Sequence, residues 1–99
     1  MSLVTIGMSH KTASLDVREK LAVDKNESRK ILKKLHSMPL VDEAFILSTC
    51  NRTEFYIEIE DLKYVDNISN WLLRQKGLSI EDFENNIYSF SDSNVVRHA

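Results

Sequence analysis

The sequence predicts an α+β fold: a ferredoxin-like split βαβ sandwich with helices on one face of a four-stranded antiparallel sheet. Three observations lead to this prediction. The expected elements follow the order β-α-β-β-α-β, and the second and third strands are close enough in sequence to form a hairpin. Both long helices are amphipathic, so each has one apolar side to bury against a sheet.

The N-terminal residues predict a strand followed by a short helix. Residues 3–8 read Leu-Val-Thr-Ile-Gly-Met, and the apolar side chains of Val4, Ile6 and Met8 would share one face of a strand. The residues that follow are polar, as expected of a loop. Ser14 has a side chain suited to capping a helix, which we expect to run to about Leu21.

A longer helix is predicted over residues 24–38. Asp24 and Glu27 have the spacing of a capping box at its N-terminus, and Pro39 marks its end. The basic side chains of its polar face belong to Arg29, Lys30, Lys33 and Lys34. Contacts with the phosphates of a nucleic acid need only positive charge, but a run of this kind is more often a solvated helix face, which is our interpretation here.

Two neighbouring apolar runs predict a β-hairpin. Residues 44–47 are apolar at every position, which is typical of a central strand with both faces covered. Residues 55–60 alternate between apolar and polar, as in a strand with one buried face. We expect these strands to pair antiparallel around a four-residue loop, Thr49–Arg52, which contains Cys50.

The C-terminal part predicts a second helix and a last strand. Asp66 is expected to cap a helix that ends at Gly77. One more helical turn over residues 79–82 and a short strand over 87–90 follow. Ser91 and Asp92 then resemble another helix start only a few residues before Ala99. We therefore expect residues 1–99 to be one truncated domain, the N-terminal piece of a longer protein.

Composition narrows the classes of function. The 99 residues suit a single domain, and a net charge of −2 means that any contact with RNA would depend on a local basic patch. One cysteine cannot form an internal disulfide, and neither a signal peptide nor a membrane-spanning stretch is visible, so we expect a cytoplasmic protein. The sequence has no glycine-rich phosphate loop, paired-cysteine metal motif or Gly-x-Ser-x-Gly elbow, so nucleotide, metal and serine-hydrolase sites gain no support.

Cys50 is the strongest candidate for a reactive group. It follows a buried run in a polar loop, where two strands would hold an exposed thiol in a fixed position. Arg52 adds a permanent positive charge nearby, which favours the thiolate, and backbone N–H groups of a tight loop can stabilise negative charge. Without further information, an inert turn cysteine beside a surface pair of Arg52 and Glu54 is the more common situation.

Two motifs resemble the glutamyl-tRNA reductase family. The segment Leu47–Glu54, Leu-Ser-Thr-Cys-Asn-Arg-Thr-Glu, resembles the signature of that family, and Gly7–Ala13 with Val17–Leu21 resembles its opening pattern. The tail that contains His98 fits the point where the family places a histidine near the active site. The similarity runs in register along the whole chain, with Ser14 where the family usually has proline.

The resemblance implies an oxidoreductase that uses NADPH to reduce glutamyl-tRNA(Glu) to glutamate-1-semialdehyde through a cysteine thioester, the first step of five-carbon tetrapyrrole (porphyrin) biosynthesis. The family's NADPH-binding and dimerisation domains are missing from residues 1–99. We therefore expect NADPH to bind outside this chain and the fragment alone to be unable to complete the reduction. The parent enzyme is expected to be a homodimer, with glutamate-1-semialdehyde aminomutase, the next enzyme of the pathway, as a further candidate partner.

The resemblance also implies roles for individual residues. Cys50 would be the nucleophile, His98 would assist in catalysis, and Arg52 would bind the γ-carboxylate of the substrate. The other candidates are Thr49 and Asn51 for substrate contacts, and His10 and Glu54 for the wall of the pocket. Two alternatives remain at this point: a ferredoxin-like interaction or regulatory module with an incidental cysteine, and a cysteine hydrolase, for which no base orienter is visible.

Overall fold

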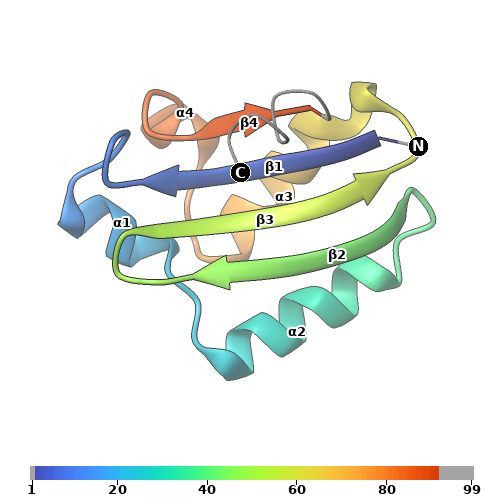
Figure 1. The fold of residues 1–99 in the computed structure, drawn as a ribbon, viewed down its shortest axis with the longest axis horizontal. Helices are drawn as coiled ribbons and strands as arrows, with labels where there is room; N and C mark the ends of the chain where they lie inside the picture. Colours follow the sequence, from blue (N-terminus) through green and yellow to red (C-terminus); the bar gives the residue numbers. More distant parts are fainter. Residues whose placement is uncertain (1, 92–99) are drawn as a thin grey trace.

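A computed structural model describes residues 2–91 of the chain. Its four-stranded sheet has the order β2-β3-β1-β4, with every neighbouring pair antiparallel (Figure 1). The strands are β1 (Ser2–Ser9), β2 (Val41–Ser48), β3 (Arg52–Ile59) and β4 (Tyr88–Phe90). This order is that of a split βαβ sandwich, so the predicted ferredoxin-like fold is confirmed.

The helices follow the predicted order along the chain. They are α1 (Leu15–Leu21), α2 (Lys25–His36), the 3-10 turn η1 (Leu62–Tyr64), α3 (Val65–Gln75) and α4 (Ile80–Phe83). Figure 1 shows α3 behind β1 and β3, and α2 running along β2. Among residues 2–91, no helix has both the length and the apolar character needed to cross a bilayer.

The core lies between this helical layer and one face of the sheet. The helices contribute the buried side chains of Leu21, Ile31, Leu35, Ile68, Leu72 and Leu73, and the two inner strands contribute Val4, Ile6, Met8, Phe55, Ile57 and Ile59. Burying a side chain of this size contributes about 1.5–3 kcal/mol. A slip of one residue in β1 or β3 would move this whole set to the opposite face, so the core fixes the register of both strands.

Local signals placed most helix ends correctly. Asp24 and Glu27 form the predicted capping box, and Gly77 ends α3 at a φ of 69°, with the Leu78 N–H donating to the Leu73 carbonyl at 2.9 Å. The predicted cap at Asp66 is wrong. This residue lies in the first turn of α3, because the chain already turns in η1, which Asp61 caps. The sequence also predicts a helix start at Ser91 and Asp92, but Asp92 lies outside the described residues.

The prediction that residues 44–47 form a central strand is wrong, because β2 lies at the edge of the sheet. Ala44 faces the core, whereas Phe45 and Leu47 lie on the opposite face and are 55% and 40% exposed. The Phe45 ring stacks on Tyr56 of β3 with a centroid distance of 4.6 Å. The apolar run therefore reflects packing on the face of the sheet opposite the helices. Pairing with β3 also shifts in register between Val41 and Glu43.

Gly7 of β1 lies opposite Glu54 of β3, at a position without room for a side chain. A Cβ at Gly7 would collide with the Thr53 carbonyl oxygen and would lie 3.0 Å from the Glu54 Cγ. We expect Gly7→Ala to lower the free energy of unfolding by roughly 1–3 kcal/mol, the usual cost of overpacking. Urea denaturation followed by Trp71 fluorescence would measure this loss.

Gly77 provides the matched control, because a Cβ there would meet nothing within 4 Å and only its φ of 69° favours glycine. Gly77→Ala should cost about 1–2 kcal/mol through this backbone conformation, and Gly77→Asn should cost less. An unfolding midpoint of Gly7→Ala equal to that of the wild type would contradict the steric explanation for Gly7.

Candidate active site

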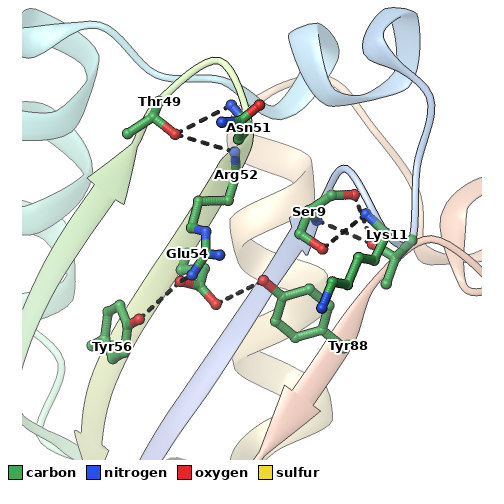
Figure 2. Close-up of polar contacts among 9 residues, drawn as sticks. Ser9, Lys11, Thr49, Asn51, Arg52, Glu54, Tyr56 and Tyr88 are labelled. Atoms are coloured by element: carbon green, nitrogen blue, oxygen red, sulfur yellow. Dashed lines mark hydrogen bonds and ion pairs between the residues drawn. The ribbon is translucent and has the colours of Figure 1, made fainter. Parts of the chain in front are cut away.

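The β2–β3 hairpin presents Cys50 at its tip, where the residue is exposed. Residues 49–51 form the loop, and Arg52, predicted to be its last residue, already begins β3. The Thr49 N–H donates to the Arg52 carbonyl at 2.7 Å, and the Thr49 hydroxyl accepts from the N–H groups of Asn51 (3.2 Å) and Arg52 (3.3 Å) (Figure 2). Thr49 therefore shapes the turn itself.

Two contacts from other segments anchor this loop. The His10 N–H donates to the Asn51 carbonyl at 2.8 Å. Arg18 of α1 donates from Nε to the Cys50 carbonyl at 3.2 Å and from Nη1 to the Ala13 carbonyl at 2.8 Å. The cysteine is thus tied to both the loop after β1 and the first helix. This role of Arg18 cannot be predicted from the sequence, since no pattern of residues shows that a side chain of the short helix α1 reaches the Cys50 carbonyl.

The loop after β1 has its own internal hydrogen bonds. The Ser9 N–H donates to the Thr12 hydroxyl at 3.1 Å, and the Lys11 N–H donates to the Ser9 hydroxyl at 3.2 Å (Figure 2). The Asn86 side-chain amide donates to the Thr12 carbonyl at 3.0 Å, which ties this loop to the segment before β4. His10, predicted to line the pocket, is exposed and contributes its backbone to the hairpin anchor.

Arg52 runs from the hairpin along β3 toward Glu54, and its Nη1 lies 3.4 Å from the Glu54 Oε1 (Figure 2). The Glu54 side chain is 0% exposed, whereas a surface pair with Arg52 is the expectation when the family resemblance is set aside. Its Oε1 also accepts from the Tyr56 hydroxyl at 2.8 Å, and its Oε2 accepts from the Tyr88 hydroxyl at 2.7 Å. Bonds of this kind compensate for taking a carboxylate out of water.

Burial and the neighbouring carboxylate change the acidity of both tyrosines. Burial, followed by the hydrogen bond to Glu54, raises the pKa of Tyr56 from 10.0 to about 12. The same two causes, in the same order, raise the pKa of Tyr88. Both hydroxyls therefore stay protonated at neutral pH and remain donors to Glu54. The sequence does not reveal the contact between Tyr88 and Glu54, because only the strand register brings Tyr88 across β1 to Glu54.

The described residues form only a small hollow beside the Cys50 thiol. A hollow of about 80 Å³ lies beside Cys50, lined by Leu15, Arg18, Glu19, Ala22 and Thr49. This volume is small against the roughly 300–1,000 Å³ of typical ligand pockets. Between residues 2 and 91, no three His, Cys, Asp or Glu side chains lie close enough together to hold a metal ion. His98, the second predicted catalytic residue, lies outside the described residues.

Comparison with known proteins gives a consistent match over the chain. Residues 6–99 match the family model for the N-terminal domain of glutamyl-tRNA(Glu) reductase. Relatives named glutamyl-tRNA reductase include those of Marinomonas, 39% identical, and Pseudomonas syringae, 42% identical, each over 99% of this chain. The chain spans 23% of the length of both relatives. In fold it resembles glutamyl-tRNA reductase from Methanopyrus kandleri, with a TM-score of 0.66, 22% identity, and coverage of 97% of this chain and 20% of that one.

Arg18 should restrict local opening of the hairpin loop. Arg18→Lys keeps the positive charge but cannot bridge the Cys50 and Ala13 carbonyls in the same way. We expect amide hydrogen exchange around residues 49–52 to quicken about fivefold, which corresponds to the ~1 kcal/mol net value of one hydrogen bond. Arg29→Lys, on the polar face of α2, is the control. Equal exchange in both variants would show that Arg18 does not anchor the loop.

The raised pKa of Tyr56 predicts a loss of stability in alkali. The pKa of the Tyr56 hydroxyl is 10.0 in the unfolded chain and about 12 in the folded one, so the folded state binds its proton more tightly. Its contribution is fully present below pH 10 and is lost as the pH rises toward 12. Urea denaturation across this range should show a steeper loss in the wild type than in Tyr56→Phe. Parallel curves for the two proteins would refute the assignment.

Proposed function

The chain belongs to the glutamyl-tRNA reductase family, as its N-terminal domain, and on that premise we propose that it supplies the nucleophile that takes glutamate from glutamyl-tRNA(Glu). The observation that carries the proposal is an exposed Cys50 on a hairpin tip whose carbonyls are held by Arg18 and His10. Covalent catalysis needs a nucleophile that is both accessible and fixed in position. No observation favours the alternative of a regulatory module with an incidental cysteine.

The first step is acyl transfer to sulfur. The Cys50 thiolate attacks the ester carbonyl carbon of glutamyl-tRNA, a C–S bond forms, and the carbonyl oxygen takes up negative charge. When the carbonyl re-forms, the C–O bond to the terminal ribose breaks, and the ribose oxygen leaves with the bonding electrons and takes a proton from water, so that the tRNA ends in a free hydroxyl. The product is a glutamyl thioester. Its carbonyl conjugates weakly with sulfur and is therefore more electrophilic than that of the ester.

The backbone at Cys50 can assist this step. The N–H groups of Asn51 and Arg52 are occupied by the Thr49 hydroxyl. The Cys50 N–H donates to no group that the structure describes in residues 2–91. A donor next to the attacking sulfur is suitably placed to stabilise a developing oxyanion. In this proposal Thr49 shapes the turn so that the Cys50 N–H remains for the substrate.

Arg52 is proposed to bind the γ-carboxylate of the glutamyl group. Its side chain is 37% exposed, and only Nη1 is described in contact with Glu54. A guanidinium has five N–H donors in a fork that matches a carboxylate, so other donors remain for the substrate. Asn51 is proposed as a further substrate contact and His98 as a catalytic assistant.

NADPH, which the family name implies, does not fit the described residues as a bound cofactor. The chain contains two glycines, fewer than a G-x-G-x-x-G dinucleotide fingerprint requires. We assign NADPH, which would supply the hydride that yields glutamate-1-semialdehyde, to another part of the full-length enzyme, and the steps derived for this chain end at the thioester. A cytoplasmic homodimer in the tetrapyrrole pathway, with glutamate-1-semialdehyde aminomutase as a partner, completes the proposal.

The nucleophile can be tested by trapping. Full-length enzyme incubated with glutamyl-tRNA(Glu) without NADPH should carry a glutamyl adduct on Cys50, detected by mass spectrometry after digestion. Cys50→Ser should abolish the adduct and lower reductase activity by roughly a thousandfold or more, as expected when a covalent nucleophile is removed.

Binding of glutamyl-tRNA by Cys50→Ser, measured in parallel, shows whether the variant retains its fold. Wild-type enzyme that binds the charged tRNA but forms no adduct on Cys50 would refute the assignment. Residues 1–99 alone should produce no semialdehyde when NADPH is added.

A further inference from the structure

One row of residues crosses the face of the sheet opposite the helices, beside the hairpin. Leu47, Glu54, Gly7 and Tyr88 lie opposite one another on β2, β3, β1 and β4. Because Gly7 has no side chain, the Tyr88 hydroxyl reaches across β1 to the Glu54 Oε2 at 2.7 Å (Figure 2). The glycine thus creates the space in which a buried carboxylate and a tyrosine from two non-adjacent strands meet.

Both tyrosines that contact Glu54 also pack against another aromatic ring. Tyr56 stacks on Phe45, with an angle of 6° between the ring planes. Tyr88 packs against Phe90 with a centroid distance of 5.2 Å. Their hydroxyls donate to different oxygens of Glu54, which restricts rotation of the carboxylate. The raised pKa values of both tyrosines are consistent with permanent donation at neutral pH.

The orientation of Glu54 determines how Arg52 binds to it. The described contact is a single one, from Nη1 to Oε1 at 3.4 Å, on an oxygen that Tyr56 also occupies. Loss of the two tyrosine donors would remove two of the described restraints on the carboxylate and would favour its rotation into a bidentate pair with the guanidinium, the geometry that arginine and carboxylate groups favour. Such a pair would occupy the donors that a substrate carboxylate needs.

We propose that Tyr56 and Tyr88 are positioning residues that hold Glu54 so that the guanidinium of Arg52 keeps a free edge for the γ-carboxylate of the glutamyl group. This inference rests on the proposed function and assigns substrate discrimination to hydroxyls on the face of the sheet opposite the helices. Neither tyrosine touches the substrate. Both act through Glu54 on Arg52, and Gly7 makes the arrangement possible.

The test uses full-length enzyme and two substrates, glutamyl-tRNA(Glu) and the mischarged glutaminyl-tRNA(Glu), in which a neutral amide replaces the γ-carboxylate. The rate of adduct formation on Cys50 is measured at low substrate concentration for each, and their ratio defines the discrimination. This ratio does not depend on the fraction of folded enzyme, so partial unfolding of a variant cannot imitate the effect. Tyr88→Phe and Tyr56→Phe remove one hydroxyl each and keep the rings.

We expect each variant to lower the discrimination roughly three- to tenfold, mainly through weaker binding of the glutamyl substrate. In an Arg52→Gln background the same tyrosine substitutions should have no further effect, because the group through which they act is gone. Tyr64→Phe, in the 3-10 turn η1, is the matched control and should leave the ratio unchanged.

Unchanged discrimination in both tyrosine variants, or an equal loss in the presence and absence of Arg52, would overturn the positioning role while leaving Cys50 as the nucleophile. Wild-type enzyme that forms no Cys50 adduct would instead overturn the proposed function, and this inference with it.

Discussion

The arrangement around the hairpin depends on the buried carboxylate of Glu54. A charge excluded from water is tolerated only when hydrogen-bond donors surround it. The described donors to Glu54 are Arg52 and Tyr56, from the same strand, and Tyr88 from β4. The arrangement also requires a residue without a side chain at position 7, between the partners. One buried group thereby constrains three strands of the sheet and connects Arg52, beside the Cys50 loop, to β1 and β4.

The Cys50 loop is held by a second and separate set of contacts. Its carbonyls accept hydrogen bonds from the Arg18 side chain and the His10 backbone, and the loop after β1 is in turn fixed by Asn86. The position of the thiol therefore depends on the first helix and the first loop, whereas that of Arg52 depends on Glu54, on the face of the sheet opposite the helices. The two chemical groups proposed to act on one substrate are thus supported from two different directions.

Features that depend on neighbours in the sequence could be predicted, whereas features that depend on contacts between distant segments could not. Alternation identified the buried face of β3, and the capping box and Gly77 placed helix ends, because each depends on neighbours a few positions away. The edge position of β2, the burial of Glu54 and the reach of Arg18 depend on which strands become neighbours. An apolar run such as 44–47 gives the same pattern in a central strand and in an edge strand whose outer face carries aromatic contacts. Family resemblance directed attention to the Cys50 loop, but the partners of Arg52 emerged only from the register.

The edge position of β2 has a consequence for solubility. An edge strand leaves backbone N–H and C=O groups available to pair with another molecule. The exposed apolar side chains of Phe45 and Leu47 would strengthen such pairing. The register shift between Val41 and Glu43 interrupts the regular spacing of those groups, and the exposed carboxylates of Asp42 and Glu43 sit at the same point. Two copies aligned edge to edge would bring like charges together where their backbones fit least well, which opposes sheet-to-sheet aggregation of this domain.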